Sequence, residues 1–121
     1  MSQVYKFEKL EVWQLSLELS DIVYELDKLL PISEQFNLYS QIKRAVTSIS
    51  LNIAEGSTNS SKLEFAKFLR ISIRSYLEVY ACYLLIKRRG FVSPNLPICN
   101  SFEELGSKLF AKLQALLKSI N

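Results

Sequence analysis

Polar side chains recur every three or four positions between residues 41 and 55, a spacing that places them along one side of a helix. They are Gln41, Arg44, Ser48, Asn52 and Glu55. One interpretation is that these groups hydrogen-bond to a neighbouring helix and fix its register, because amides and charges are costly to bury unpaired. The other is that Arg44 belongs to a surface that binds phosphate groups.

Cationic side chains are concentrated in the middle of the chain. The net charge is +3 overall, but it is −3 for residues 1–33, +5 for residues 34–90 and +1 for residues 91–121. A basic middle beside an acidic start predicts either an anionic partner or charge pairing between subunits. The cations expected to bind RNA or DNA through phosphate contacts are Lys43, Arg44, Lys67, Arg70, Arg74, Lys87, Arg88 and Arg89.

The triplet at residues 87–89 has a second interpretation, because cations also stabilise the C-terminal end of a helix. No helix-turn-helix, zinc-finger or RNA-recognition signature accompanies the basic residues. The prediction of nucleic-acid binding therefore depends on charge alone.

Catalytic chemistry has few candidate residues. The chain has no histidine, which removes the commonest general base and metal ligand. Its two distant cysteines do not make a zinc site, and its three glycines do not make a phosphate loop. Glu55 and Glu78 are the carboxylates expected in apolar surroundings, and a capping, pairing or interface role is favoured for both. Glu78 lies four residues after Arg74, a spacing that allows an ion pair. We expect a protein that is not an enzyme and has no metal or cofactor.

The cysteines and the hydropathy bear on location. Cys82 falls in an apolar helical stretch and is expected to be buried, whereas Cys99 follows two prolines in a predicted loop. A disulfide between them is an open alternative, although a cytosolic chain gives little reason to expect one.

No apolar run reaches the ~18–20 residues that a membrane span needs, and no signal segment is seen at the start. We expect a cytoplasmic protein without a membrane partner.

The elements that must position these residues are predicted by hydrophobic periodicity. Four amphipathic helices are expected, at about residues 9–30, 34–55, 62–89 and 102–119. In the first, apolar residues recur with the 3-4-3-4 spacing of a helix in a bundle, and acidic residues cover much of the rest. The predicted fold is an all-α, antiparallel up-down four-helix bundle in one domain, residues 1–121.

Local signals set the expected helix boundaries. The predicted N-caps are Ser33, Ser61 and Ser101, with Ser60 as a competing cap one residue before Ser61. Ser61 and Ser101 each have a glutamate three residues later, as in a capping box. The predicted stop signals are Pro31, Gly56 and Gly90.

An apolar stretch interrupts the outer side of the third predicted helix. It consists of Leu77, Ala81, Leu84 and Leu85. The bundle core does not need these residues, and an exposed patch of this kind is costly for a monomer. They are therefore predicted to contact a neighbouring subunit, together with Ser48, Asn52 and Glu55 if the polar residues fix subunit register. A hydrophobic content of 49% also favours an oligomer.

Short motifs over most of the chain resemble a known family. They are FEKLEVW at 7–13, LP at 30–31, EQFNL at 34–38, QIKRA at 41–45, SI at 48–49, NIAEG at 52–56, EF at 64–65, FL at 68–69, and Ser75 with Glu78. The chain resembles the four-helix-bundle proteins encoded within intervening sequences of bacterial 23S rRNA genes. It is also similar to their relatives, the accessory variability proteins of diversity-generating retroelements.

The resemblance implies a bundle that assembles into a homopentameric barrel with a basic surface. For the retroelement relatives it also implies binding to nucleic acid and to a reverse transcriptase. Two positions depart from the family pattern: Asn59 stands where a basic residue is frequent, and Arg74 stands where a small residue is usual. We expect a homo-oligomer, with a pentamer favoured, that binds RNA or DNA. The alternative is a protein–protein scaffold, or an accessory subunit of a reverse transcriptase, that does not itself contact nucleic acid.

Overall fold

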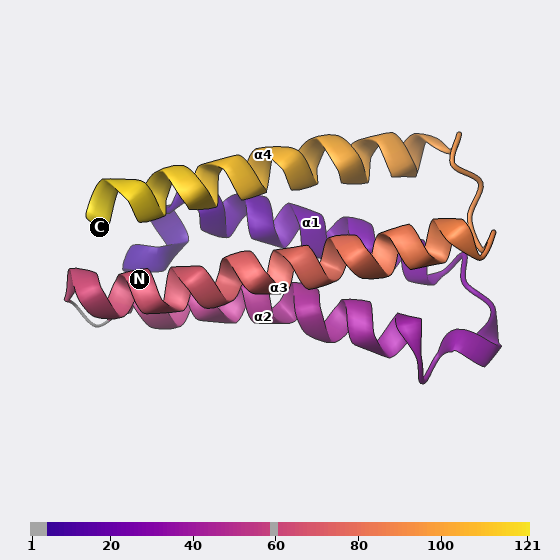
Figure 1. Ribbon diagram of the computed structural model, residues 1–121, viewed down its shortest axis with the longest axis horizontal. Helices are drawn as coiled ribbons and strands as arrows, with labels where there is room; N and C mark the ends of the chain where they lie inside the picture. Colours follow the sequence, from indigo (N-terminus) through magenta and orange to yellow (C-terminus); the bar gives the residue numbers. More distant parts are fainter. Residues whose placement is uncertain (1–4, 59–60) are drawn as a thin grey trace, which may run out of the picture.

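The computed structural model describes residues 5–58 and 61–121, which contain helices and turns but no strand (Figure 1). The helices are a short 3₁₀ turn η1 (Lys6–Lys9), α1 (Glu11–Asp27), a second 3₁₀ turn η2 (Ile32–Glu34), α2 (Leu38–Thr58), α3 (Lys62–Arg88) and α4 (Pro97–Ile120). Asn59, one of the two departures from the family pattern, and Ser60, the competing cap, lie outside the described residues.

The four long helices run up and down along a shared direction (Figure 1). Around the bundle, α2 packs between α1 and α3, and α4 packs against both α1 and α3. This arrangement confirms the predicted all-α four-helix bundle. It leaves one side of every helix facing outward.

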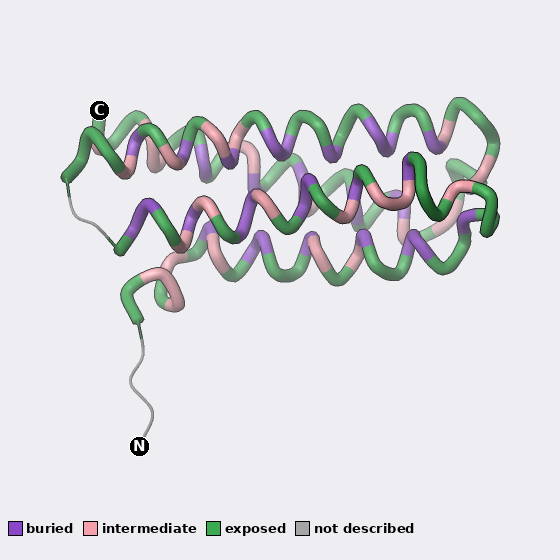
Figure 2. The backbone as a smooth tube through the Cα atoms, turned by 90° about the horizontal axis from the view of Figure 1, so that it is seen from below, coloured by how far each residue is buried: buried purple, intermediate pink, exposed green. Residues whose placement is uncertain are grey.

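The core is built from the inward side of each helix (Figure 2). Leu19 of α1, Ile49 of α2, Leu69 of α3 and Leu109 of α4 are all completely buried. Burying one such side chain stabilises the fold by about 1.5–3 kcal/mol. The apolar residues that recur every three or four positions in the sequence are therefore the residues that form the core.

Serine hydroxyls join α2 to α3 at the centre of the bundle. The Ser72 hydroxyl donates to the backbone carbonyl of Ile49 over 2.9 Å, and the hydroxyl oxygens of Ser48 and Ser75 lie 2.9 Å apart. Small side chains at these positions let the two helices approach closely. The hydrogen bonds also satisfy the hydroxyl groups that this packing buries.

The prediction that Gly56 ends the second helix is wrong. α2 continues to Thr58, and Gly56 is buried within it. A Cβ atom on Gly56 would lie 2.7 Å from Cβ of Phe68 in α3, so this glycine permits close helix packing and does not form a left-handed cap. Gly90 has a positive φ, of 74°, which confirms the predicted stop after α3.

The start of α2 and the end of α1 also differ from the prediction. Residues 32–34 form η2, so Ser33 is not an N-cap and α2 begins at Leu38. The regular part of α1 ends at Asp27, three residues early. Residues 28–30 continue as tight turns, because each of their backbone N–H groups bonds to the carbonyl three residues before it.

The last helix begins at Pro97, not at residue 102. Proline suits the first helical position because its φ is already helical and its missing N–H would have no partner there. Ser101 is therefore inside α4, and its predicted capping box does not start a helix. Cys99, expected in a loop, is buried in α4, and both Cys82 and Cys99 are free thiols.

The start of α3 agrees with the prediction. The Ser61 hydroxyl accepts a hydrogen bond from the Glu64 backbone N–H over 3.0 Å, as expected for an N-cap. The bounds of α3 lie within one residue of the predicted range.

Candidate functional site

Three cations form an exposed surface on the N-terminal half of α3. Lys67, Arg70 and Arg74 are spaced three and four residues apart and therefore lie on one side of the helix. None of them forms an ion pair with any residue in the described parts of the chain. The pair that the spacing of Arg74 and Glu78 would allow is not formed in the structure. We call Lys67, Arg70 and Arg74 the α3 basic face.

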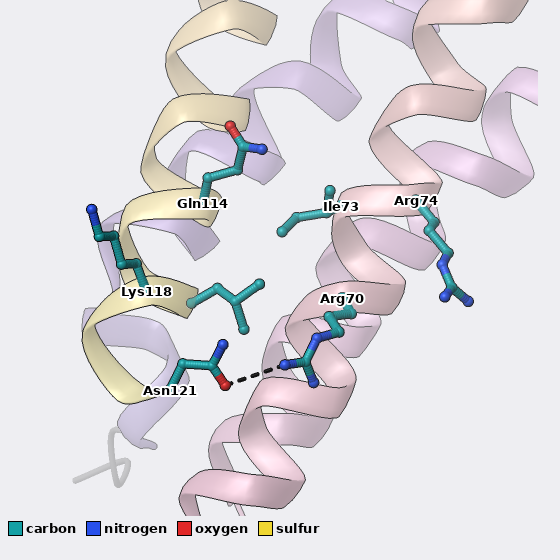
Figure 3. A pocket seen from close by; sticks show the side chains of 7 residues that line it. Arg70, Ile73, Arg74, Gln114, Lys118 and Asn121 are labelled. Atoms are coloured by element: carbon teal, nitrogen blue, oxygen red, sulfur yellow. Dashed lines mark hydrogen bonds between the residues drawn. The ribbon is translucent and has the colours of Figure 1, made fainter.

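A groove of about 690 Å³ lies beside the basic face, between α3 and α4. Its lining residues are Arg70, Ile73, Arg74, Gln114, Leu117, Lys118 and Asn121. Figure 3 shows Ile73 between the two helices, with polar side chains on either side of it. An Arg70 guanidinium N–H donates to the side-chain oxygen of Asn121 over 3.2 Å and so bridges the groove at its end (Figure 3).

Lys43 is not part of this basic face, because it has a partner within the chain. Its ammonium nitrogen lies 3.6 Å from a carboxylate oxygen of Asp27 and 4.1 Å from the ring centre of Tyr39. The carboxylate and the aromatic face both compensate its charge. Lys43 therefore acts at the junction of α1 and α2, and the prediction that it lies on a phosphate-binding surface receives no support from its position.

Asp27 itself is unusual, because its side chain is buried and neither carboxylate oxygen has a hydrogen-bond partner among the described residues. Burial raises the pKa of Asp27 from 3.8 to about 6, and the nearby Lys43 charge opposes this rise only in part. At 3.6 Å the Lys43 contact is longer than a good hydrogen bond.

Lys87 is likewise engaged, at the opposite end of α3. Its ammonium lies 3.3 Å from Glu103 of α4, and the Tyr83 hydroxyl donates to the same carboxylate oxygen. The hydrogen bond from Tyr83, followed by the contact with Lys87, lowers the pKa of Glu103. Burial, and then the bond to Glu103, raises the pKa of Tyr83. This cluster holds α3 against α4 and leaves Lys87 little freedom to bind another anion.

The polar residues of α2 divide into two groups. Ser48 and Asn52 are partly buried: Ser48 contacts Ser75 of α3, and the Asn52 amide donates to the Ser48 carbonyl over 2.8 Å. Ser48 thus joins α2 to α3 within the same chain, whereas the hydrogen bonds of Asn52 stay within α2. Arg44 and Glu55 are exposed, so Glu55 does not have the apolar surroundings expected of it.

The C-terminal half of α3 presents the predicted apolar stretch to the outside. Leu77, Leu84 and Leu85 are 48%, 45% and 44% exposed, and Ala81 lies exposed among them. We call these four residues the α3 apolar patch. Arg88 and Arg89 are exposed beyond it, about 27 Å from Arg70 at ~1.5 Å rise per residue. They therefore do not join the basic face.

Sequence reasoning missed the contribution of α4. Gln114 and Lys118 line the groove opposite the basic face. The two residues are four apart and flank Leu117, so they share one side of the helix. That spacing was visible in the sequence, but no pattern in it indicated that this side would face Arg70.

Two further findings concern the described residues only. They contain no cluster of three or more histidine, cysteine, aspartate or glutamate side chains able to hold a metal ion. None of their helices combines the length and the apolar character needed to cross a bilayer.

This protein is an up-down four-helix bundle. It carries an exposed basic face and a groove beside that face. Comparison with protein families makes the assignment specific. The chain belongs to the 23S rRNA-intervening sequence protein family, whose model matches residues 8–115. The resemblance to that family is thereby confirmed, whereas the relation to the retroelement proteins stays a prediction.

A solved structure shows the same fold. It is the crystal structure of a protein of unknown function from the S23 ribosomal protein family of Bacteroides thetaiotaomicron. The two chains are 25% identical and superpose with a TM-score of 0.79, over 88% of this chain and 98% of the other. A comparison with curated proteins gave no match.

Proposed function

We propose that this protein is a cytoplasmic, non-enzymatic, homo-oligomeric bundle that binds RNA or DNA through phosphate contacts. The observation that carries the proposal is the α3 basic face, where Lys67, Arg70 and Arg74 project together with no acidic partner among the described residues. Lys118 adds a fourth cation across the groove. Clustered exposed cations attract the phosphate backbone and release its counterions on binding.

Charge reversal of the basic face tests this proposal. The triple variant Lys67→Glu, Arg70→Glu, Arg74→Glu should abolish binding of a labelled RNA or DNA strand in a fluorescence anisotropy titration. Because each phosphate contact contributes about 0.7–0.9 to the slope of log affinity against log salt, wild-type binding should also weaken steeply with salt.

The matched control is Lys9→Glu, Lys28→Glu, Lys108→Glu, which makes the same change in net charge at three exposed positions outside the basic face. This control should keep most of the affinity. Retention of salt-insensitive binding by the first triple variant would exclude the basic face as the binding surface.

The second candidate function is a protein–protein scaffold, for instance an accessory subunit of a reverse transcriptase. It is favoured by the α3 apolar patch, because leucines that remain this exposed on one chain are typical of an interaction surface. An Arg44→Ala variant separates the two functions. Loss of the oligomer would support a register role for Arg44 between subunits, whereas an intact oligomer with weaker nucleic-acid binding would support a ligand role.

A further inference from the structure

The groove between α3 and α4 has the composition of a site for an amphipathic anion. Its floor is apolar, with Ile73 and Leu117 both partly buried against the core. Its rims are cationic: Arg70 and Arg74 lie on α3, and Lys118 lies on α4. None of the described residues that line it is acidic. A ligand that fits would therefore combine an apolar, flat or compact part with negative charge next to it.

The amides in the groove narrow the choice of ligand. Gln114 lies across from Ile73, and Asn121 lies at the end of the groove, where its carbonyl oxygen accepts from Arg70 (Figure 3). Within the part of the chain that the structure describes, the Asn121 amide nitrogen and both polar atoms of Gln114 have no hydrogen-bond partner. Side-chain amides offer a donor and an acceptor together, as the edges of nucleobases do.

The directions of the Arg70 and Arg74 side chains show how the groove lies relative to the basic face. In Figure 3 the Arg74 side chain runs along the outer side of α3, whereas Arg70 reaches toward α4. A nucleic-acid backbone bound along Lys67, Arg70 and Arg74 would therefore pass the mouth of the groove. A base that turns away from this backbone would enter the space between Ile73 and Leu117.

From these observations we infer that the α3–α4 groove holds an unpaired base of a single-stranded RNA or DNA. The inference rests on the proposed function and names the form of nucleic acid that is bound. The volume of about 690 Å³ is within the range typical of small-ligand sites. A base within a duplex is stacked and paired, and cannot enter.

The first test compares three labelled ligands by fluorescence anisotropy: a single strand, its duplex, and a strand of equal length whose internal bases are replaced by abasic sites. Phosphate contacts alone favour the duplex, because its charge density is higher. If a base enters the groove, the single strand should bind more tightly than the duplex. We expect the single strand to bind about fivefold to tenfold more tightly than the abasic strand, a range set by a few hydrogen bonds and apolar contacts.

Two conservative variants locate the base. Gln114→Leu keeps the side-chain volume but removes the amide, and should weaken binding of the base-bearing strand while leaving the abasic strand unchanged. Lys118→Gln removes a charge and should weaken both strands. Gln41→Leu is the matched control, because Gln41 is exposed on α2 outside the groove.

The outcomes distinguish this inference from the proposed function. Equal binding of the base-bearing and abasic strands, with no effect of Gln114→Leu, would overturn the inference and leave phosphate binding by the basic face intact. Failure of every nucleic acid to bind would overturn both.

Discussion

Asp27 is a carboxylic acid whose charged form is poorly solvated. The side chain is only 2% exposed, and the groups that face it are Lys43 at 3.6 Å and the Tyr39 ring beneath that lysine. Because its pKa rises from 3.8 to about 6, the folded chain holds this proton more tightly than the unfolded chain does. The resulting stabilisation is fully present below pH ~4 and is lost as the pH rises through about 6.

An Asp27→Asn variant should therefore be more stable than the wild type at pH 7. We expect the free energy of unfolding to increase by about 1–2 kcal/mol, because one pKa unit corresponds to about 1.4 kcal/mol and the variant loses the Lys43 contact. The gain should shrink toward pH 4, where the wild-type acid is already protonated. Urea denaturation at a series of pH values measures both effects.

Asp21→Asn supplies the control, since Asp21 is an exposed aspartate on the same helix. It should change neither the stability nor its pH dependence appreciably. A loss of stability in Asp27→Asn at pH 7 would show that attraction to Lys43 outweighs the cost of burying the carboxylate.

At the scale of helices, the close contact between α2 and α3 depends on Gly56, which has no Cβ atom. A Gly56→Ala substitution should destabilise the protein by about 1–3 kcal/mol, as overpacking does. The added Cβ would meet Cβ of Phe68, which is fixed to the α3 backbone and cannot rotate away. Thermal unfolding followed by circular dichroism would measure the loss.

Gly106→Ala offers a matched comparison on α4. There the new Cβ would lie 2.8 Å from the hydroxyl oxygen of Tyr76, the far end of a side chain that can shift. We expect a smaller loss of stability than for Gly56→Ala. An equal or larger loss would contradict the view that backbone proximity of α2 and α3 sets the cost.

The sequence was sufficient to predict the helices but not how closely they approach. In each helix the residues that face the core, such as Leu19, Ile49 and Leu109, belong to a series of apolar residues that recurs with the helical period. This period alone predicts the four helices. Gly56 has the sequence context of a helix stop, and only the position of Phe68 reveals its packing role. Ser101 and Glu104 match a capping box, yet Pro97 starts the helix earlier.

The candidate site was predictable on α3 but not across the bundle. The spacing of Lys67, Arg70 and Arg74 is a property of one helix and can be read from the chain. The partners of Lys43 and Lys87 come from other helices, as does Lys118 of the groove. Which charges are paired and which are free therefore depends on distances that no local pattern contains.

For the whole molecule, the α3 apolar patch predicts self-association. Light scattering on the wild type at micromolar concentration should give a mass several times that of one 13.9 kDa chain. Leu77→Glu combined with Leu84→Glu should reduce the mass to that of a monomer while leaving the helix content unchanged, because both residues are exposed on the single chain. Burying a charge at such a contact is costly.

Ile32→Glu is the control for added charge, since Ile32 is 87% exposed in η2 and lies outside the patch. Its mass should equal that of the wild type. A wild-type chain that is monomeric under these conditions would rule out the oligomer.

The division of α3 into a basic half and an apolar half has one further consequence. Because the two surfaces occupy successive stretches of one helix, a bound strand and a second copy of the chain would not compete for the same residues. In a homo-oligomer the groove would then recur at a fixed spacing, and each bound segment would raise the effective concentration of the next. Affinity would increase in steps with strand length, and weak individual contacts would act with high avidity.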